Sequence, residues 1–222
     1  MQHFLIDTIG RLGTSPTLAA AGAVAFASCV ALAADGHDHD HAEPSVPAVG
    51  DTVSGDAVVL TAAGEEVTLG SLWEDGPVVV TFYRGGWCPF CTEALQDWRT
   101  RVEELEEAGA YFVAITPEKP SYTSATEEKY DLPYDVYSDA SFAAADTFGL
   151  RFSLSSETKT KYKGYGIDLG KHNATQTWEL PIPGTFVIDS EGVVQFVYAD
   201  EDFRKRVDPD EVIAAVRELG SE

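Results

Sequence analysis

Two cysteines separated by two residues, Cys88 and Cys91, are the side chains in this sequence best suited to covalent chemistry. They lie between a β-branched, aromatic run over residues 77–83 and a helical pattern over residues 89–108. A position at the start of a helix favours a thiolate at Cys88, because unpaired backbone N–H groups and the helix dipole stabilise negative charge. Cys91 follows one turn later on the same side of the helix, so the two sulfur atoms can form a reversible disulfide.

Two neighbours of the cysteine pair are candidates for supporting this chemistry. Arg84 either stabilises a thiolate through its positive charge or simply pairs with a surface carboxylate. Trp87 either shields the pair and contacts a partner or only packs against the rest of the protein. The sequence leaves both choices open.

Other uses of a Cys-x-x-Cys pair are less favoured. A structural disulfide across two residues closes too small a loop to stabilise the fold much. A zinc site needs further ligands, and beyond residue 50 the sequence has no other cysteine and only one histidine, His172. A cysteine hydrolase would depend on that same histidine. Thiol redox chemistry is therefore the favoured interpretation.

The first part of the chain has the pattern of an export signal. An apolar run over residues 18–34 follows Arg11, and the sequence Ala31-Leu32-Ala33 matches the small-x-small pattern of a signal peptidase site. We expect cleavage after Ala33, which makes the protein periplasmic or extracellular. Two alternatives stay open: a membrane anchor formed by residues 18–34, and a lipoprotein signal at Cys29.

The expected domain organisation has three parts. Residues 1–33 form the signal peptide or anchor, residues 34–50 a linker rich first in His and Asp and then in Pro and Ala, and residues 51–222 one folded domain. In the linker, His37, His39 and His41 are weak candidates for a metal site, but no ordered framework fixes them, so a solvated tether is favoured. No cofactor and no other metal is expected.

Composition limits the possible functions. Hydrophobic residues make up 44% of the 222 residues, which is enough to bury a core. The 37 acidic residues outnumber the 15 basic ones, giving a formal net charge of −22. A surface this negative repels phosphate backbones, so nucleic-acid binding is excluded.

Hydrophobic patterns beyond residue 50 predict strands and helices that position the cysteines. Residues 77–83, 89–108 and 111–116 predict a strand, a helix and a strand, and therefore a parallel βαβ unit with a right-handed crossover. Residues 150–180 show no clear period and are expected to form a flap, a dimer contact or an irregular insertion. The remaining predicted elements are hairpins over residues 58–69 and 185–198, helices over 121–130, 141–148 and 208–219, and a strand over 135–137.

Two segments also carry a resemblance to a known family. Residues 82–91 and 180–189 resemble the peroxiredoxin-like branch of the alkyl hydroperoxide reductase and thiol-specific antioxidant family. The likeness spans about residues 50–220. It implies an α/β thioredoxin-like fold, with a central mixed β-sheet flanked by helices.

The resemblance can be aligned in two ways. The peroxiredoxin pattern Pro-x-x-x-Thr/Ser-x-x-Cys makes Cys91 the residue that attacks peroxide, with Arg84 in place of the proline and Cys88 in place of the threonine. The family's later arginine then falls at Pro183. The thioredoxin pattern instead makes Cys88 the attacking thiol and Cys91 the resolving one. In that alignment Pro183 is the cis-proline beside the disulfide, and we predict a cis Ile182–Pro183 bond.

Three functional hypotheses follow. The first is a peroxiredoxin-like peroxidase that reduces hydrogen peroxide or organic hydroperoxides, with a thioredoxin-like protein or another dithiol as reductant. The second is an exported thiol-disulfide oxidoreductase acting on protein disulfides. The third, least favoured, is a metal-binding module without enzymatic activity. The sequence gives no oligomeric state.

Overall fold

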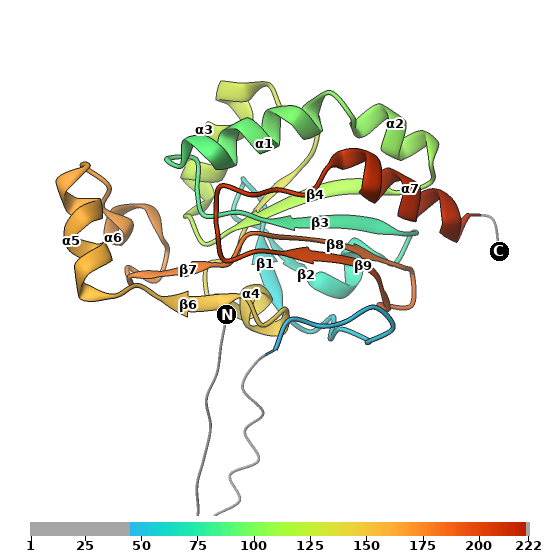
Figure 1. The fold of residues 1–222 in the computed structure, drawn as a ribbon, viewed down its shortest axis with the longest axis horizontal. Coiled ribbons are helices and arrows are strands. Elements are labelled where there is room, and N and C mark those ends of the chain that lie inside the picture. The colour runs from blue at the N-terminus through green and yellow to red at the C-terminus, as the bar shows by residue number, and fades with distance from the viewer. Residues whose placement is uncertain (1–44, 221–222) are drawn as a thin grey trace, which may run out of the picture. The chain divides into compact units, whose positions relative to one another are not determined.

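The computed structural model describes residues 45–220, whose centre is a seven-stranded sheet (Figure 1). The strand order is β2-β1-β5-β4-β3-β8-β9. These strands are β1 Val58–Leu60, β2 Glu66–Thr68, β3 Val78–Phe82, β4 Tyr111–Thr116, β5 Val136–Ser138, β8 Gly184–Ile188 and β9 Val194–Ala199. The helices that cover this sheet are α1 Pro89–Arg99, α2 Val102–Glu107, α3 Pro120–Tyr130, α4 Ala143–Thr147 and α7 Pro209–Leu219, together with a short 3-10 helix, η1 Leu69–Leu72.

The sheet is mixed, as the sequence predicts. Strands β3 and β4 pair in parallel, from Val78 opposite Tyr111 to Phe82 opposite Ile115, and β5 joins β4 in parallel. The βαβ unit expected around the cysteines is therefore present. Strand β8 pairs antiparallel with β3, and the two predicted hairpins form β1–β2 and β8–β9.

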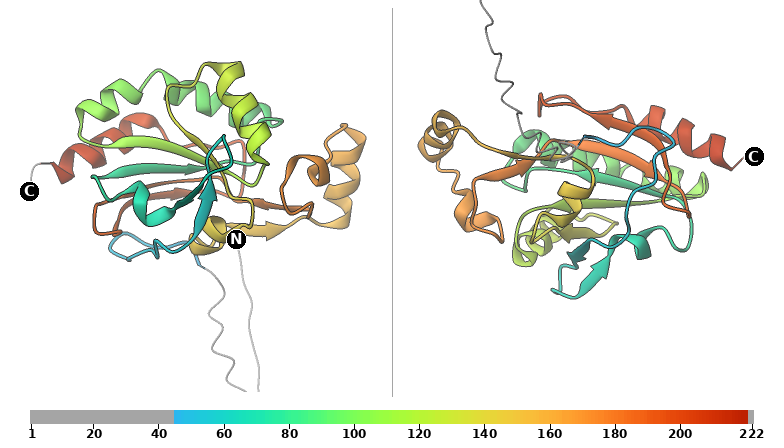
Figure 2. Two further views of the ribbon diagram at one scale, coloured as in Figure 1. Left: turned by 180° about the vertical axis from the view of Figure 1, so that it is seen from behind. Right: turned by 90° about the horizontal axis from the view of Figure 1, so that it is seen from below.

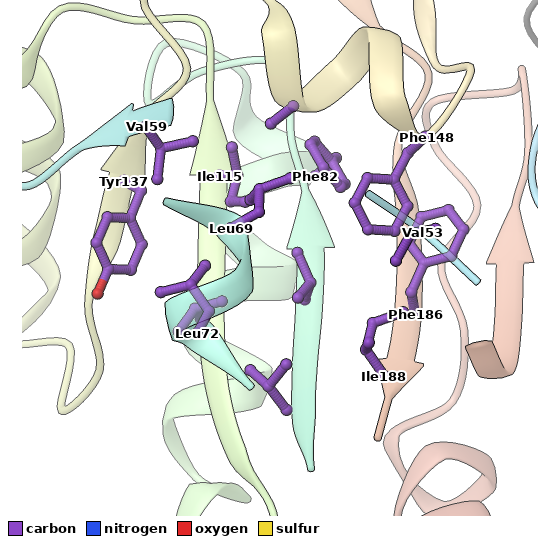
Figure 3. Close-up of a cluster of buried hydrophobic side chains, with 14 of the residues drawn as sticks. Val53, Val59, Leu69, Leu72, Phe82, Ile115, Tyr137, Phe148, Phe186 and Ile188 are labelled. Atoms are coloured by element: carbon purple, nitrogen blue, oxygen red, sulfur yellow. The ribbon is translucent and has the colours of Figure 1, made fainter. Parts of the chain in front are cut away.

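Both faces of the sheet are buried. Helices α1, α2 and α7 pack on one face through an apolar cluster that includes Leu95, Trp98 and Ile213 (Figures 1 and 2). The opposite face carries Phe82 and Phe186 beneath η1 and α4 (Figure 3). Burial on both faces explains why β3 is apolar except at Thr81, and it holds the end of that strand next to the cysteines.

The single helix predicted over residues 89–108 is wrong. The structure breaks it into α1 and α2 at Thr100 and Arg101. The Thr100 hydroxyl and its backbone N–H both bond to the carbonyl of Asp97, at 2.8 and 3.1 Å, and the N–H of Arg101 bonds to Trp98. The two backbone N–H groups thus bond three residues back, as in a 3-10 turn, and a hydrophobic periodicity does not record this change.

Residues 150–180 form a small ordered unit at one end of the sheet. Strands β6 Arg151–Ser153 and β7 Glu179–Pro181 pair antiparallel, and helices α5 Ser156–Gly164 and α6 Leu169–His172 lie between them. This unit projects from the sheet on the left of Figure 1. Leu154, Leu169 and Leu180 form its own apolar cluster, which also contacts Trp87.

The packed part of the chain begins before Asp51, where the sequence places the start of the domain. The N–H of Gly50 donates to the carbonyl of Val194 at 2.8 Å, and Val46 packs against the core. The predicted signal or anchor over residues 1–33, Cys29 and the three linker histidines lie outside the described residues. Among residues 45–220, no helix is long and apolar enough to cross a membrane.

Candidate active site at the start of α1

Cys88 and Cys91 lie where the sequence analysis expects them. Cys88 is the N-cap of α1 with an extended backbone, Pro89 takes the first helical position, and Cys91 lies in the first turn. The N–H groups of Cys91 and Thr92 bond to the carbonyl of Cys88, each at 3.0 Å. Both sulfur-bearing residues are buried, and both are free thiols.

Two glycines let the loop before α1 fold tightly. Gly85 has a φ of +146°, and a Cβ built there would lie 2.3 Å from the indole nitrogen of Trp87. A Cβ on Gly86 would lie 2.4 Å from the hydroxyl of Thr126. The loop is also held by the buried carboxylate of Glu118, which accepts the Gly86 N–H at 2.7 Å. The Gly85-Gly86 pair therefore fixes the approach of the chain to Cys88.

The environment separates the two thiols in acidity. The thiol of Cys91 donates a hydrogen bond to the Cys88 sulfur; this bond, with the positive charges of Arg84 and Arg206, lowers the pKa of Cys88 to about 6 despite its burial. Burial raises the pKa of Cys91, and negative charge on Cys88 raises it further. The favoured state at neutral pH is therefore a Cys88 thiolate that accepts a hydrogen bond from a Cys91 thiol.

The site also contains a residue that the sequence analysis missed. Arg206, in the connection between β9 and α7, donates from Nη2 to the Cys91 sulfur at 3.4 Å. The same guanidinium bonds to the carbonyls of Phe203 and Lys205, which orient it. A separation of 115 positions from Cys91, with no motif around Arg206, leaves no local sequence signal for this contact.

The predicted supporting residues gather around the same loop. Arg84 is almost completely buried, and its guanidinium lies 5.2 Å from the ring centre of Trp87. Arg84 forms no ion pair with a carboxylate in the described part of the chain and is not on the surface, so the interpretation as a surface pair is not supported. Trp87 is half-buried and contacts Tyr162 of α5 edge-on at 5.8 Å. Pro183 lines a cavity together with Arg84. The cis form of its peptide bond stays a prediction.

His172 contacts Glu118 rather than the cysteine pair. Its Nδ1 lies 3.0 Å from a carboxylate oxygen of Glu118, and its ring packs against Tyr122. Glu118 thus joins the loop at Gly86 to α6 in the unit formed by residues 150–180. No cluster of three or more potential metal-ligating side chains occurs within residues 45–220.

This arrangement is suited to two-electron thiol chemistry. It provides one ionised sulfur, a second thiol that already contacts it, and two guanidinium groups that stabilise negative charge nearby. An oxidised Cys88 can therefore be attacked by Cys91 with little movement of the helix.

Comparisons with known proteins agree with this chemistry. The model of the AhpC/TSA family matches residues 49–197. The chain is 30% identical over 156 residues to the chloroplastic peroxiredoxin Q of Suaeda salsa, covering 70% of this chain but only 62% of that protein. It is 29% identical over 173 residues to a putative peroxiredoxin of Mycobacterium tuberculosis, covering 78% of this chain and 97% of the relative.

Solved structures share the fold. Peroxidoxin BcpB from Mycobacterium tuberculosis superposes with a TM-score of 0.59 at 27% identity, covering 77% of this chain and 97% of the other. A peroxiredoxin-like protein from Aquifex aeolicus gives a TM-score of 0.61 at 20% identity, covering 78% and 90%. The second likeness supports the fold alone, and together they confirm the thioredoxin-like fold expected from the sequence.

Proposed function

Because the chain belongs to the AhpC/TSA family, we propose that it is a thiol peroxidase that reduces hydrogen peroxide or organic hydroperoxides. The observation that carries this proposal is the thiol pair, in which Cys91 donates to Cys88 and lowers its pKa to about 6. A thiol with that pKa is mostly ionised at neutral pH, and the thiolate is the form that attacks peroxide.

In the first half of the cycle, the Cys88 thiolate attacks an oxygen of the peroxide. An S–O bond forms as the O–O bond breaks, and the leaving alkoxide or hydroxide takes the proton of the Cys91 thiol. The products are a sulfenic acid on Cys88 and an alcohol or water. Arg206 stabilises the Cys91 thiolate that this proton transfer creates.

In the second half, the Cys91 thiolate attacks the sulfur of the Cys88 sulfenic acid. A disulfide forms, and the hydroxide that leaves is protonated by solvent. An external dithiol, such as a thioredoxin-like protein, then reduces the disulfide by exchange and is itself oxidised. This step returns both cysteines to thiols.

The reverse order of attack is the alternative within the same activity. In the peroxiredoxin alignment Cys91 attacks first, and the contact from Arg206 to its sulfur favours that order. The low pKa of Cys88 and the deeper burial of the Cys91 thiol favour attack by Cys88, which is the order we propose.

Exchange with protein disulfides is the second candidate function. The observation that favours it is the position of Cys88 as an acidic thiol at the N-cap of α1, followed by Pro89. A thiolate in this position attacks disulfides as well as peroxides. The two candidates differ in the bond that Cys88 breaks.

Stopped-flow oxidation of the reduced protein by hydrogen peroxide and by an alkyl hydroperoxide tests these proposals. We expect rapid oxidation of the wild type, no reaction of Cys88→Ser, and a sulfenic acid on Cys91→Ser that dimedone traps. A sulfenic acid on Cys88→Ser would reverse the order of attack. Negligible reaction with either peroxide, together with rapid Cys88-dependent reduction of a protein disulfide, would leave the exchange enzyme.

Export is a further part of the proposal. Its support is the apolar run over residues 18–34, followed by the small-x-small pattern that ends at Ala33. We expect the protein to be periplasmic or extracellular, with an N-terminus at Ala34 when it is purified from its own cells and sequenced. An N-terminus at Met1 in a membrane fraction would instead identify residues 18–34 as an anchor.

A further inference from the structure

Arg84 is a buried cation, and two of the three nitrogen atoms of its guanidinium have no hydrogen-bond acceptor within residues 45–220. Only 2% of the residue is exposed, and its Nε and Nη1 atoms have no acceptor there. Arginine stays charged in proteins, so a buried guanidinium without acceptors is costly unless something else supplies them. Buried donors without acceptors at a functional site call for an explanation, and an anionic ligand would supply both the acceptors and the opposite charge.

Aromatic rings hold the guanidinium in place without satisfying these donors. Its central carbon lies 3.9 Å from the ring centre of Phe203, 5.2 Å from that of Trp87 and 5.5 Å from that of Tyr162. Such contacts stabilise the charge through the faces of the rings. They do not accept the in-plane N–H groups of Nε and Nη1, which stay without an acceptor in the described residues.

A cavity of about 280 Å³ adjoins Arg84. This volume is close to the lower limit for sites that enclose small organic molecules. Residues 150–180, for which the sequence left a flap, a dimer contact or an insertion open, supply much of its wall. Besides Arg84, the lining residues are the apolar or aromatic Phe152, Leu154, Tyr162, Pro183 and Phe203 and the polar Ser153, Ser155, Thr158 and Glu201.

We propose that this cavity binds a carboxylate group, and that the enzyme prefers hydroperoxides that carry a carboxylate on a short alkyl or aryl frame. The planar fork of Arg84 matches the two oxygens of a carboxylate, and the aromatic wall accommodates the apolar frame. Arg84 also interacts electrostatically with both cysteines, so a substrate bound there lies near the reacting sulfur. This inference rests on the proposed peroxidase function.

The charges around the cavity make the preference specific. The chain carries a net charge of −22, and the exposed Glu201 lines the same cavity, so the surroundings of the Arg84 guanidinium oppose the binding of anions. Binding is favourable only for a carboxylate that contacts the buried guanidinium, because its attraction to Arg84 then exceeds its repulsion by the acidic residues. Glu201→Gln should therefore tighten carboxylate binding several-fold, while Arg84→Gln should abolish most of it.

Calorimetric titration of the reduced protein with phenylacetate tests the site without any redox reaction. We expect measurable binding of phenylacetate and no binding of the neutral phenylacetamide. Arg84→Gln should lower the affinity for phenylacetate 10- to 100-fold. This factor corresponds to about 1.5–3 kcal/mol, the range for hydrogen bonds to a charged group. Arg84→Lys, which keeps the charge but not the fork, should fall between. Arg99→Gln, a change outside the cavity, is the matched control.

Competition between two substrates tests the preference itself. We expect a carboxylate-bearing aryl hydroperoxide to exceed its methyl ester at least 10-fold in kcat/KM, and the ratio to approach one in Arg84→Gln. Equal rates in the wild type, or equal phenylacetate binding by wild type and Arg84→Gln, would overturn the inference but leave the peroxidase function. If the protein reduces neither hydroperoxide but still binds phenylacetate, the peroxidase function is overturned and the carboxylate site stands.

Discussion

The two cysteines have the same side chain but opposite acidities, and the difference comes from where α1 places them. Cys88 caps the helix and receives a hydrogen bond, whereas Cys91 is enclosed by the core and gives one. The proton shared between the sulfurs therefore belongs to Cys91 at neutral pH. This asymmetry is what distinguishes an attacking thiol from a resolving thiol.

The first prediction concerns the titration of Cys88. Its pKa is lowered to about 6, so the rate of alkylation by iodoacetamide should rise with pH through a midpoint near 6. Cys91→Ala removes the largest cause of the shift, and should move the midpoint upward; Arg84→Gln should do so by a smaller amount. Cys91→Ser retains a hydrogen-bond donor and is the control. A wild-type midpoint between 8 and 9 would contradict this assignment.

The second prediction concerns the stability cost of Arg84. At pH 5, below the pKa of about 6 of Cys88, the Cys88 thiol is mostly neutral and Arg84 has no thiolate to stabilise. Because two nitrogen atoms of its buried guanidinium lack acceptors in the described residues, Arg84→Met should then raise the free energy of unfolding by about 1–2 kcal/mol, even though it removes contacts with aromatic rings. Urea denaturation of the reduced proteins measures this change. Arg99→Met, at a residue with 44% of its side chain exposed, should alter stability by only about 0.5 kcal/mol. A clear loss of stability in Arg84→Met would show that the charge is satisfied.

At the scale of elements, Asp139 connects β5 to α4 and carries a buried carboxylate. Its two oxygens accept the N–H groups of Ala144 and Ala145, at 3.2 and 2.8 Å. Burial raises the pKa of Asp139 to about 6, although these two bonds act in the opposite direction. The folded state therefore binds this proton more tightly than the unfolded state does.

The third prediction follows from that difference. A raised pKa in the folded state contributes stability at low pH, and this contribution is lost as pH rises from about 4 to 6. The wild type should therefore lose about 3 kcal/mol relative to Asp139→Asn over this range, because the shift is about two pKa units. Urea denaturation of both proteins at several pH values measures the difference. A constant difference would show that Asp139 keeps an ordinary pKa.

Elements with a complete local signal could be predicted from the sequence. Strand β4 has the predicted bounds, and both hairpins and the final helix are present, because alternating hydrophobicity, turn glycines and the Asp208 cap determine them within a few residues. The break at Thr100 could not be predicted, since the backbone N–H groups of Thr100 and Arg101 bond three residues back there, and the hydrophobic pattern does not record such a change. Residues 150–180 lack a periodic pattern because α5 buries none of its residues.

At the scale of the whole molecule, the candidate site combines a local motif with distant contacts. Cys88, Cys91, Arg84 and Trp87 lie within eight positions and could be recognised together. The arginine on Cys91 comes from the connection before α7, and the cavity wall comes from residues 150–180. Only the tertiary fold brings these parts together, so a single sequence cannot indicate them.

The fourth prediction concerns the net charge of −22, which should destabilise the folded protein through mutual repulsion of its acidic residues. Glu106 and Glu107 are exposed at the C-terminal end of α2, where the helix dipole adds to this repulsion. The double change Glu106→Gln/Glu107→Gln should raise the melting temperature by about 2–4 °C in 20 mM NaCl, which corresponds to about 1 kcal/mol.

Salt provides the decisive comparison for this effect. In 1 M NaCl the screening length falls to about 3 Å, so the melting temperature of the wild type should rise and its difference from the double variant should nearly disappear. Glu211→Gln removes one negative charge from the first turn of α7, where the dipole favours an acid, and should give little or no gain. If Glu211→Gln stabilised the protein as much per charge as the double variant does, net repulsion alone would account for the effect and the position on the helix would not matter.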